Sequence, residues 1–361
     1  MSKKIIITGA MGFVGATLVE HILRNTDWNI VTIDRLDTSG NPNRLAYMEC
    51  WEAEKHRVKI LYWDLKAEFN DQISKMIGSF DYFVHMAAGS HVDRSITDPM
   101  SFVMDNVVGT ANVLEFFRKY FNGYMNDTSI LTSNEEALQE SLRIQEEGKP
   151  KFLYFSTDEV FGPAPEGVAF KEYDRFNPNN PYAATKAGAE CLCDAYANTY
   201  RLPIIVTHSM NIFGERQHPE KFVPMLINKI QAGETVTIHA DNTKTKSGTR
   251  HYLHTRNICS AVIFLLENGK TLDGKCQDGK YNVVGEREVS NLEMAQLIAD
   301  ILGKELKYEM VDFHTSRPGH DLRYALDGSH LKDAGFEYPV TFEDSLRKTV
   351  EWTLAHPKWL L

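Results

Sequence analysis

Residues 4–15 read KIIITGAMGFVG, an apolar run that leads directly into a glycine-rich stretch. The spacing GxxGxxG predicts a strand, a tight turn and a helix that begins near Gly12. Gly9 permits the turn, Gly12 lets the backbone approach a pyrophosphate, and Gly15 lets the helix pack on the strand. The free N–H groups of a helix N-terminus favour an anion. This stretch therefore predicts a dinucleotide-binding βα unit.

Apolar runs rich in β-branched and aromatic residues recur along the first half of the chain and alternate with helical patterns. The predicted buried strands are Lys4–Thr8, Asn29–Asp34, Arg57–Tyr62, Asp81–His85, Lys151–Ser156 and Pro203–Thr207. The clearest predicted helices are Gly12–Asn25, Pro99–Tyr120, Tyr182–Tyr200, Asn291–Leu302 and Thr341–Ala355. Nearly continuous apolar strands alternating with helices predict an α/β fold with a Rossmann-type, doubly wound parallel sheet.

Changes in pattern divide the chain. Residues 1–210 are predicted to form the NAD-binding domain, interrupted by a polar surface insertion at residues 121–150 that is partly helical over Asn134–Glu147. Residues 211–361 show short mixed elements. They are predicted to form a smaller mixed α/β domain for the substrate, with some chain crossing back to the first domain.

Composition excludes several classes of function. A net charge of −10 argues against a general nucleic-acid-binding protein. The cysteines show no paired CxxC pattern, so we expect reduced thiols and no metal site; they are Cys50, Cys191, Cys193, Cys259 and Cys276. The chain begins MSKKIIITGA and enters a strand at once, which is too short for a signal peptide, and no apolar run approaches a membrane span. We expect a cytoplasmic protein without a membrane partner.

An acidic residue ends the second predicted strand. A carboxylate at Asp34 can accept hydrogen bonds from an adenosine ribose and repel a 2′-phosphate, which favours NAD over NADP. Arg35 follows directly and weakens that preference. Asp64, after the third strand, is placed to reach the adenine. The predicted cofactor-binding residues are Gly9, Gly12, Phe13, Val14, Gly15, Asp34, Asp64 and Leu65, together with Tyr182 and Lys186.

Two further segments carry acid–base chemistry. Tyr182 and Lys186 lie four residues apart on a predicted helix, where an ammonium beside a phenol favours the phenolate and lowers its pKa. Thr157, Asp158 and Glu159 follow the fifth predicted strand, at the edge of the sheet where open α/β folds place their chemistry. Together they predict a catalytic site for proton transfer.

These segments resemble the dTDP-glucose 4,6-dehydratase family of extended short-chain dehydrogenases/reductases. The resemblance extends from Ile7 to Asp327 and rests on ITGAMGFVG, HMAAGSHVDRSI, NVVGT, YFSTDEVFG, NPYAATKAGAE, the PEKFVP run and SRPGHDLRYALD. The triplet Thr157-Asp158-Glu159 is the specific part, because related epimerases and decarboxylases usually have Ser or Thr without the acid pair.

The resemblance implies a role for each catalytic residue. Tyr182, helped by Lys186 and Thr157, deprotonates the glucose 4-hydroxyl while a hydride passes to NAD⁺. Glu159 then removes the C5 proton and Asp158 protonates the departing C6 hydroxyl. The hydride returns to C6, which gives a 4-keto-6-deoxy sugar. The residues implied to bind the nucleotide sugar are Ser90, Asn211, Glu220, Lys221, Arg250, Arg317 and His320.

Departures from the family pattern leave the nucleobase open. Gly89, His208 and His251 differ from the common residues, and residues 235–249 match least well. A UDP-glucose 4,6-dehydratase is therefore one alternative. An NAD-dependent sugar-nucleotide epimerase or decarboxylase is a second, and a non-catalytic NAD-binding protein is a third. The resemblance also implies a homodimer that pairs the helices predicted at Pro99–Tyr120 and Tyr182–Tyr200.

Overall fold

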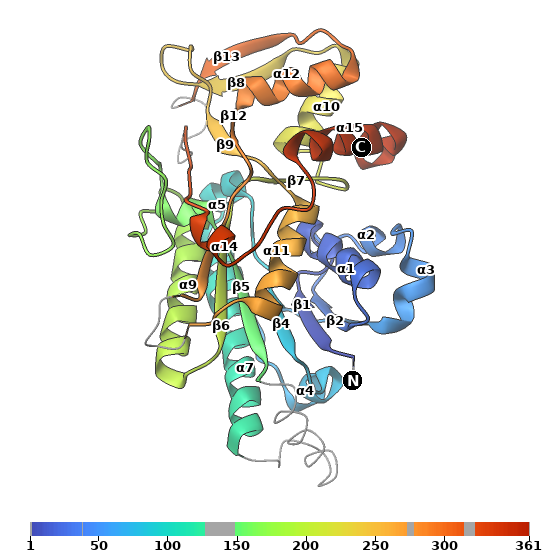
Figure 1. Ribbon diagram of the computed structural model, residues 1–361, viewed down its shortest axis with the longest axis vertical. Helices are drawn as coiled ribbons and strands as arrows, with labels where there is room; N and C mark the ends of the chain where they lie inside the picture. The colour runs from blue at the N-terminus through green and yellow to red at the C-terminus, as the bar shows by residue number, and fades with distance from the viewer. Residues whose placement is uncertain (1, 38, 127–148, 273–277, 314–321, 361) are drawn as a thin grey trace.

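A seven-stranded sheet forms the centre of the computed structural model, which describes residues 2–37, 39–126, 149–272, 278–313 and 322–360 (Figure 1). Its order is β11-β6-β5-β4-β1-β2-β3, and all neighbouring strands are parallel. The strands are β1 (Lys4–Thr8), β2 (Asn29–Asp34), β3 (Val58–Tyr62), β4 (Tyr82–His85), β5 (Lys151–Thr157), β6 (Ile204–Ser209) and β11 (Lys280–Val283). The order changes direction between β1 and β4, which makes this a doubly wound Rossmann-type sheet, as predicted.

Helices cover both faces of this sheet, and the alternation of β1 shows how. Ile5 and Ile7 belong to one apolar cluster with α1 and α11, whereas Ile6 belongs to another with α7 and α9. The helices of the sheet layer are α1 (Phe13–Asn25), α2 (Asn43–Ala46), α3 (Trp51–Glu54), α4 (Asp71–Ile77), α5 (Val92–Thr97), α6 (Pro99–Phe102), α7 (Gly109–Asn126), α9 (Pro181–Tyr200), α11 (Thr255–Asn268) and α14 (Ser329–Asp333), with the short 3₁₀ helices η1 (Lys55–Arg57) and η4 (Asp158–Phe161).

The predicted helix Pro99–Tyr120 is not a single regular α-helix. A π-helical segment, η2 (Val103–Val108), separates α6 from α7. Helix α7 then continues to Asn126, so it includes the first residues of the predicted insertion, and Phe121 is buried in the core. The rest of that insertion, including the helix predicted at Asn134–Glu147, lies outside the described residues.

The seventh strand, β11, has no counterpart among the predicted strands. It comes from the second half of the chain and pairs with β6 over Lys280–Val283. Its sequence, KYNV, contains two polar residues, yet all four residues are buried. Lys280 and Asn282 can be buried in this strand because they contact other buried polar groups. A search for runs of apolar residues does not detect such a strand.

The chain after residue 210 builds a second core in the upper part of Figure 1. Its members include Phe213, Leu226, Ile238, Ile298 and Leu346. The elements here are β7 (Ile212–Phe213), α10 (Phe222–Ala232), β8 (Val236–Ala240), β9 (Thr249–His251), β10 (Leu253–His254), β12 (Glu288–Ser290), α12 (Asn291–Leu302), β13 (Tyr308–Asp312), α15 (Phe342–Ala355) and η5 (Pro357–Leu360). The division into an NAD-binding and a substrate domain stays a prediction.

A small apolar cluster joins the two parts at the carboxyl edge of the sheet. Val160 and Phe161, just after β5, pack with Met210, Tyr324 and Leu326. This contact fixes the segment that carries the predicted acid pair against chain from the second half. Among the described residues, no helix has both the length and the apolar character needed to cross a bilayer.

Candidate active site

The glycine-rich turn between β1 and α1 leaves no room for side chains. Gly9 has φ +71°, and a Cβ there would lie 2.8 Å from the backbone of Ala87. A Cβ on Gly15 would lie 2.2 Å from the Gly9 carbonyl oxygen. Gly12 is the N-cap of α1 and provides no side-chain cap. The turn therefore presents bare backbone and a helix N-terminus, an arrangement that fits the pyrophosphate of a dinucleotide; Phe13 and Val14 form the first turn of α1.

Asp34 ends β2 with its carboxylate directed back toward this turn. It accepts hydrogen bonds from the backbone N–H groups of Met11 (3.0 Å) and Leu36 (2.9 Å). These contacts hold the carboxylate beside the glycine-rich turn, where the sequence predicts an adenosine ribose. Leu65, a predicted cofactor-binding residue, is buried, and Asp64, predicted to reach the adenine, is part of an ion-pair network.

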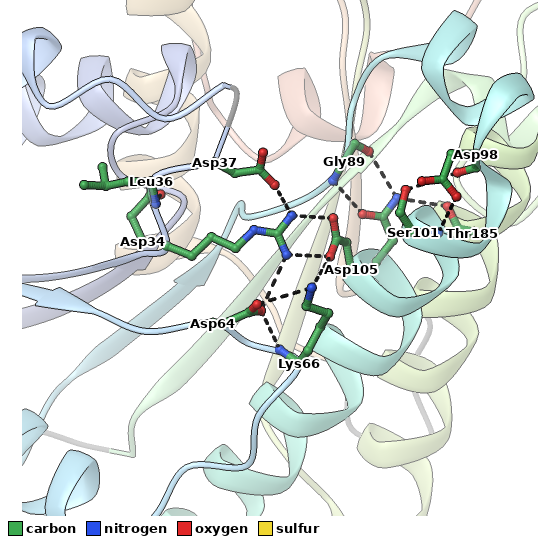
Figure 2. A network of polar contacts seen from close by, with 12 residues as sticks. Asp34, Leu36, Asp37, Asp64, Lys66, Gly89, Asp98, Ser101, Asp105 and Thr185 are labelled. Carbon is green, nitrogen blue, oxygen red and sulfur yellow. Dashed lines mark hydrogen bonds and ion pairs between the residues drawn. The ribbon is translucent and has the colours of Figure 1, made fainter.

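Arg35 lies at the centre of that network, between the acids Asp37, Asp64 and Asp105 that Figure 2 labels. Its guanidinium donates two hydrogen bonds of 2.6 Å to Asp105 on η2, and it also pairs with Asp37 and, at 3.5 Å, with Asp64. Hydrogen bonding to Asp105 holds the pKa of Arg35 above its usual range. Lys66 donates its backbone N–H to Asp64 at 3.0 Å. The Arg35 side chain is thus bound by acids of the protein, which leaves little of its charge for a 2′-phosphate.

The predicted acid pair follows β5 in the short helix η4. Thr157 caps η4 by accepting the Glu159 N–H, and its hydroxyl donates to Asp158 Oδ1 at 3.0 Å. Asp158 is 4% exposed, and its Oδ2 is buried with no hydrogen-bond partner among the described residues. Burial and the neighbouring Glu159 raise the pKa of Asp158 to about 7, and Arg250 opposes the rise. A buried carboxyl of this kind retains its proton and can act as a general acid.

Tyr182 and Lys186 lie on the first turns of α9, close to this triplet. Burial and the charges of Glu159 and Asp158 raise the pKa of Tyr182, although a hydrogen bond with Thr157 opposes the shift. Lys186 Nζ donates to the Phe155 carbonyl at 2.6 Å and lies 4.3 Å from the centre of the Tyr154 ring. Burial lowers the pKa of Lys186 to about 8.

One expectation about this pair is therefore wrong. The sequence predicts that Lys186 lowers the pKa of Tyr182, but the pKa of Tyr182 is raised. Burial and two adjacent acids raise the pKa of Tyr182, and the Lys186 ammonium is directed to a backbone carbonyl. The Tyr182 hydroxyl therefore keeps its proton unless a positive charge lies close to it.

Asn180 is a site residue that sequence reasoning missed. It is the N-cap of α9, where its Oδ1 accepts the Ala183 N–H at 2.8 Å, and its Nδ2 donates to Glu159 Oε2 at 3.0 Å. Ser95 accepts the Tyr182 N–H at 3.1 Å. The motif NPY contains the signal, because Asn before Pro is typical of a helix start. Its second contact depends on the tertiary fold.

The π-helical segment η2 joins this region to the loop after β4. Asn106 accepts the Gly89 N–H at 2.8 Å and donates to the Gly89 carbonyl and to Thr185, at 3.1 and 2.9 Å. Figure 2 labels its partners Gly89 and Thr185. A Cβ at Gly89 would lie 3.1 Å from the Phe102 ring. The missing side chain at Gly89 thus lets the end of α6 and the loop approach closely. Extra residues in a π-turn often mark functional regions.

The predicted substrate-binding residues fall into two groups. Arg250 lies near enough to Asp158 to oppose the rise of its pKa; it donates to the carbonyls of Thr249 and Leu322, both at 2.7 Å, and stacks on Tyr324. Glu220 pairs with Arg94 at 3.3 Å, beside Lys221.

Of the remaining predicted substrate-binding residues, two are exposed and two lie outside the described residues. Ser90 and Asn211 are exposed at the carboxyl ends of β4 and β6. Arg317 and His320 lie outside the described residues, so their predicted contacts with the substrate remain predictions. Within the described part of the chain, no cluster of His, Cys, Asp and Glu has the arrangement of a metal site.

Comparison with known proteins identifies relatives across the whole chain. The family model for GDP-mannose 4,6 dehydratase matches residues 6–349. The dTDP-glucose 4,6-dehydratase of Salmonella typhimurium is 33% identical, over 99% of this chain and 94% of that protein. The low-salt glycan biosynthesis protein Agl12 of Haloferax volcanii is also 33% identical, over 97% of this chain and 98% of that protein.

Solved structures agree with these relatives. The dTDP-glucose 4,6-dehydratase of Bacillus anthracis in complex with NAD has a TM-score of 0.79 and 27% identity, over 99% of this chain and 98% of that one. The UDP-glucose 4-epimerase of Thermus thermophilus has a TM-score of 0.78 over 98% of this chain and 99% of that one, but at 23% identity it shows a shared fold alone. The acid pair after Thr157, the match to the family model and the relatives above together show that this chain belongs to the nucleotide-sugar 4,6-dehydratase family.

Proposed function

We propose that this protein is an NAD-dependent hydro-lyase that converts dTDP-glucose into dTDP-4-keto-6-deoxy-glucose. The observation that carries the proposal is the state of Asp158. It is a buried carboxyl with a pKa raised to about 7, beside Tyr182 and Glu159, and one of its oxygens has no hydrogen-bond partner in the part of the chain that the structure describes. Elimination of water across C5 and C6 needs both an acid and a base, and the two adjacent carboxyl groups can divide these roles.

The residues around the first turn fit NAD. The glycine-rich turn would hold the pyrophosphate, Asp34 the adenosine ribose, and Asp64 and Leu65 the adenine. Bound NAD⁺ would supply the redox chemistry, as the acceptor of the C4 hydride and, in its reduced form, as the donor of that hydride to C6. Asp34 and the engaged Arg35 both disfavour a 2′-phosphate, which supports NAD rather than NADP.

The protein's own residues carry the proton transfers. Tyr182 takes the proton of the 4-hydroxyl, assisted by Thr157, which bonds to it, and by the charge of Lys186. The resulting 4-ketone acidifies the C5 proton. Glu159, held by Asn180, removes that proton. Asp158 gives its proton to the C6 hydroxyl, which leaves as water, and C5 is reprotonated at the end of the cycle.

A reaction in deuterated water tests this proposal. The product should have lost one water and should carry one deuterium, at C5, while the hydrogen of C4 is recovered at C6. Glu159→Gln should stop incorporation of deuterium at C5. Deuterium at C5 in the product of that variant would assign the base to another residue.

Epimerase or decarboxylase activity is the alternative, and the acid pair argues against it. Those reactions do not require a proton donor at C6, so the protonated Asp158 would have no task. An epimerase would return a product with the mass of the substrate. A UDP-linked substrate is the other alternative, because residues 235–249 match the family pattern least well and leave the nucleobase open.

We also propose a homodimer that pairs the helices around α9. Helices α5 and α6 and segment η2 pack beside α9, and they expose Ile96, Met100 and Met104, which are 41%, 63% and 39% exposed. Three large apolar side chains spaced four residues apart suit a contact with another protein surface. A second copy of the chain is the partner that the family resemblance implies, and a cytoplasmic location is retained as an expectation from the sequence.

A further inference from the structure

A buried network of charged side chains lies under the proposed catalytic centre and has no task in the proposed mechanism. Its members come from three elements: Glu190 and Asp194 from α9, His208 from β6, and Lys280 from β11. Glu190 and His208 have no exposed surface, and Lys280 has 4%. Charges removed from water to this extent must compensate one another.

Glu190 accepts hydrogen bonds from three side chains. Ser156 Oγ donates to Oε2 at 2.7 Å, Lys280 Nζ donates to Oε1 at 2.8 Å, and His208 Nε2 lies 2.9 and 3.1 Å from the two oxygens. A carboxyl group that accepts on both oxygens is ionised. Burial works against this, but His208 and Lys280 hold the pKa of Glu190 below its usual range.

The other ring nitrogen of His208 also faces an acceptor. Nδ1 lies 3.0 Å from Asn282 Oδ1. The orientation of the Asn282 amide is fixed, because its Nδ2 donates to the carbonyls of Phe170 and Asp327, both at 3.0 Å. The oxygen that faces the ring can only accept, so Nδ1 must donate, as Nε2 must donate to the carboxylate.

We infer that His208 carries a proton on both ring nitrogens in the folded protein, and that the Glu190–His208 pair is a positioning pair for the catalytic base. With His208 positive, the formal charges of the two acids and the two bases in the network sum to zero. With a neutral imidazole they would leave one uncompensated negative charge, shared with Asp194, whose side chain is 34% exposed, and an acceptor oxygen would face a bare ring nitrogen.

The other groups around His208 are consistent with this assignment. The Phe161 ring meets the imidazole edge-on at 4.9 Å. Glu172 accepts the backbone N–H of Asn282 at 3.0 Å rather than a proton of the ring. Lys280 Nζ also donates a hydrogen bond to Asp194 at 2.8 Å. The rings of Tyr173 and Phe176 lie within 5.6 Å of that ammonium.

The pair acts on catalysis through position and charge. Glu190 lies two helical turns after Tyr182 on α9, and it binds Ser156, the residue before Thr157. It therefore fixes α9 against the end of β5, which sets how Tyr182 meets Thr157. The positive charge of His208 also prevents Glu190 from placing a net negative charge below Tyr182, where it would raise the pKa of the base. This part of the inference rests on the proposed function.

Nitrogen-15 NMR of the wild-type protein tests the protonation state without any assay of activity. Both ring nitrogens of His208 should show directly bonded protons near neutral pH. His85 is an internal control: it is buried between the hydroxyls of Thr8 and Thr110, at 2.7 and 3.0 Å, and burial lowers its pKa to about 3. It should show one bare nitrogen. A bare nitrogen on His208 would overturn the inference even if the protein proves to be a dehydratase.

The pH dependence of kcat/KM tests the connection to the base. In His208→Gln the network gains one net negative charge, so the acidic limb of the profile should move up by about one pH unit. The double variant His208→Gln, Glu190→Gln restores neutrality and should return the limb to its wild-type position at a lower kcat. A limb that stays in place in the single variant would contradict the inference. A wild-type protein without dehydratase activity would instead refute the proposed function. The NMR experiment would still report the protonation state of His208.

Discussion

Burial keeps a proton on Asp158 at pH values at which an exposed aspartic acid is ionised. Because the pKa of Asp158 is raised to about 7 in the folded protein, folding binds a proton between about pH 4 and pH 7. Stability from this residue is therefore present at low pH and is lost as the pH rises through that window. The same property supplies a proton to a leaving hydroxyl, so function and stability are opposed at this side chain.

Asp158→Asn should separate these two effects. We expect kcat to fall about 10²–10³-fold, because the amide cannot protonate the C6 hydroxyl. At pH 8 the variant should be more stable than the wild type by roughly 1–4 kcal/mol, since no buried charge is formed there. Thermal unfolding at pH 5 and pH 8 measures this difference, which should be large only at pH 8. Equal destabilisation at both pH values would show that Asp158 is not held protonated by burial.

Asn180 combines a structural and a proposed catalytic contact in one side chain. Asn180→Asp keeps the cap of α9 but cannot donate to Glu159 and places a like charge beside it. We expect the free energy of unfolding to change by about 1 kcal/mol or less and kcat to fall about 10-fold or more. Asn70→Asp is the matched control, because Asn70 caps α4 through Ile73 N–H at 2.9 Å, in a different helix. Equal activities of the two variants would remove Asn180 from the site.

At the scale of elements, the sequence predicted most of the fold because apolar periodicity is local. Six strands of the sheet lie within two residues of their predicted bounds, and α12 matches its prediction in full. The failures have long-range causes. Strand β11 is polar because Lys280 and Asn282 contact buried acids and carbonyls of other elements. Segment η2 departs from α-helical geometry where Asn106 binds Gly89 and Thr185, which no spacing rule could reveal.

The same limit applies to the candidate site. The glycine-rich turn, the acid pair and the Tyr-Lys pair have recognisable spacings, and the structure brings Thr157, Asp158 and Tyr182 together. The direction of the Tyr182 pKa depended on tertiary neighbours and was predicted wrongly. Asn180 and Asp105 were missed because each acts through a residue far away in sequence.

The ion pair between Arg35, just after β2, and Asp105 on η2 predicts how the cofactor is selected. Asp105→Asn removes the acid that accepts two hydrogen bonds from Arg35, so more of the guanidinium charge becomes available to a 2′-phosphate. We expect the ratio of affinities for 2′,5′-ADP and ADP, measured by calorimetry, to rise about 10-fold. Glu115→Gln, which breaks an equivalent pair with Arg118 on α7, should leave the ratio unchanged. An unchanged ratio in Asp105→Asn as well would mean that Asp34 alone excludes the phosphate.

At the scale of the whole molecule, the exposed methionines next to α9 predict the state of assembly. The wild type should sediment as a dimer, and Met100→Glu should weaken the dimer by at least 10-fold, because a charge would be buried in an apolar contact. Met76→Glu is the control, since Met76 is 39% exposed on α4. A wild-type monomer, or a Met100→Glu dimer as stable as the control, would place the interface elsewhere.

The most direct test of the account is the mass of the product formed from dTDP-glucose by the purified protein without added cofactor. The account predicts a product lighter by one water, because the hydride taken from C4 is returned at C6 and no net oxidation occurs. UDP-glucose in a parallel reaction identifies the preferred base. An unchanged mass with both substrates, in protein that retains NAD, would contradict the dehydratase assignment and with it the roles of Asp158 and Glu159.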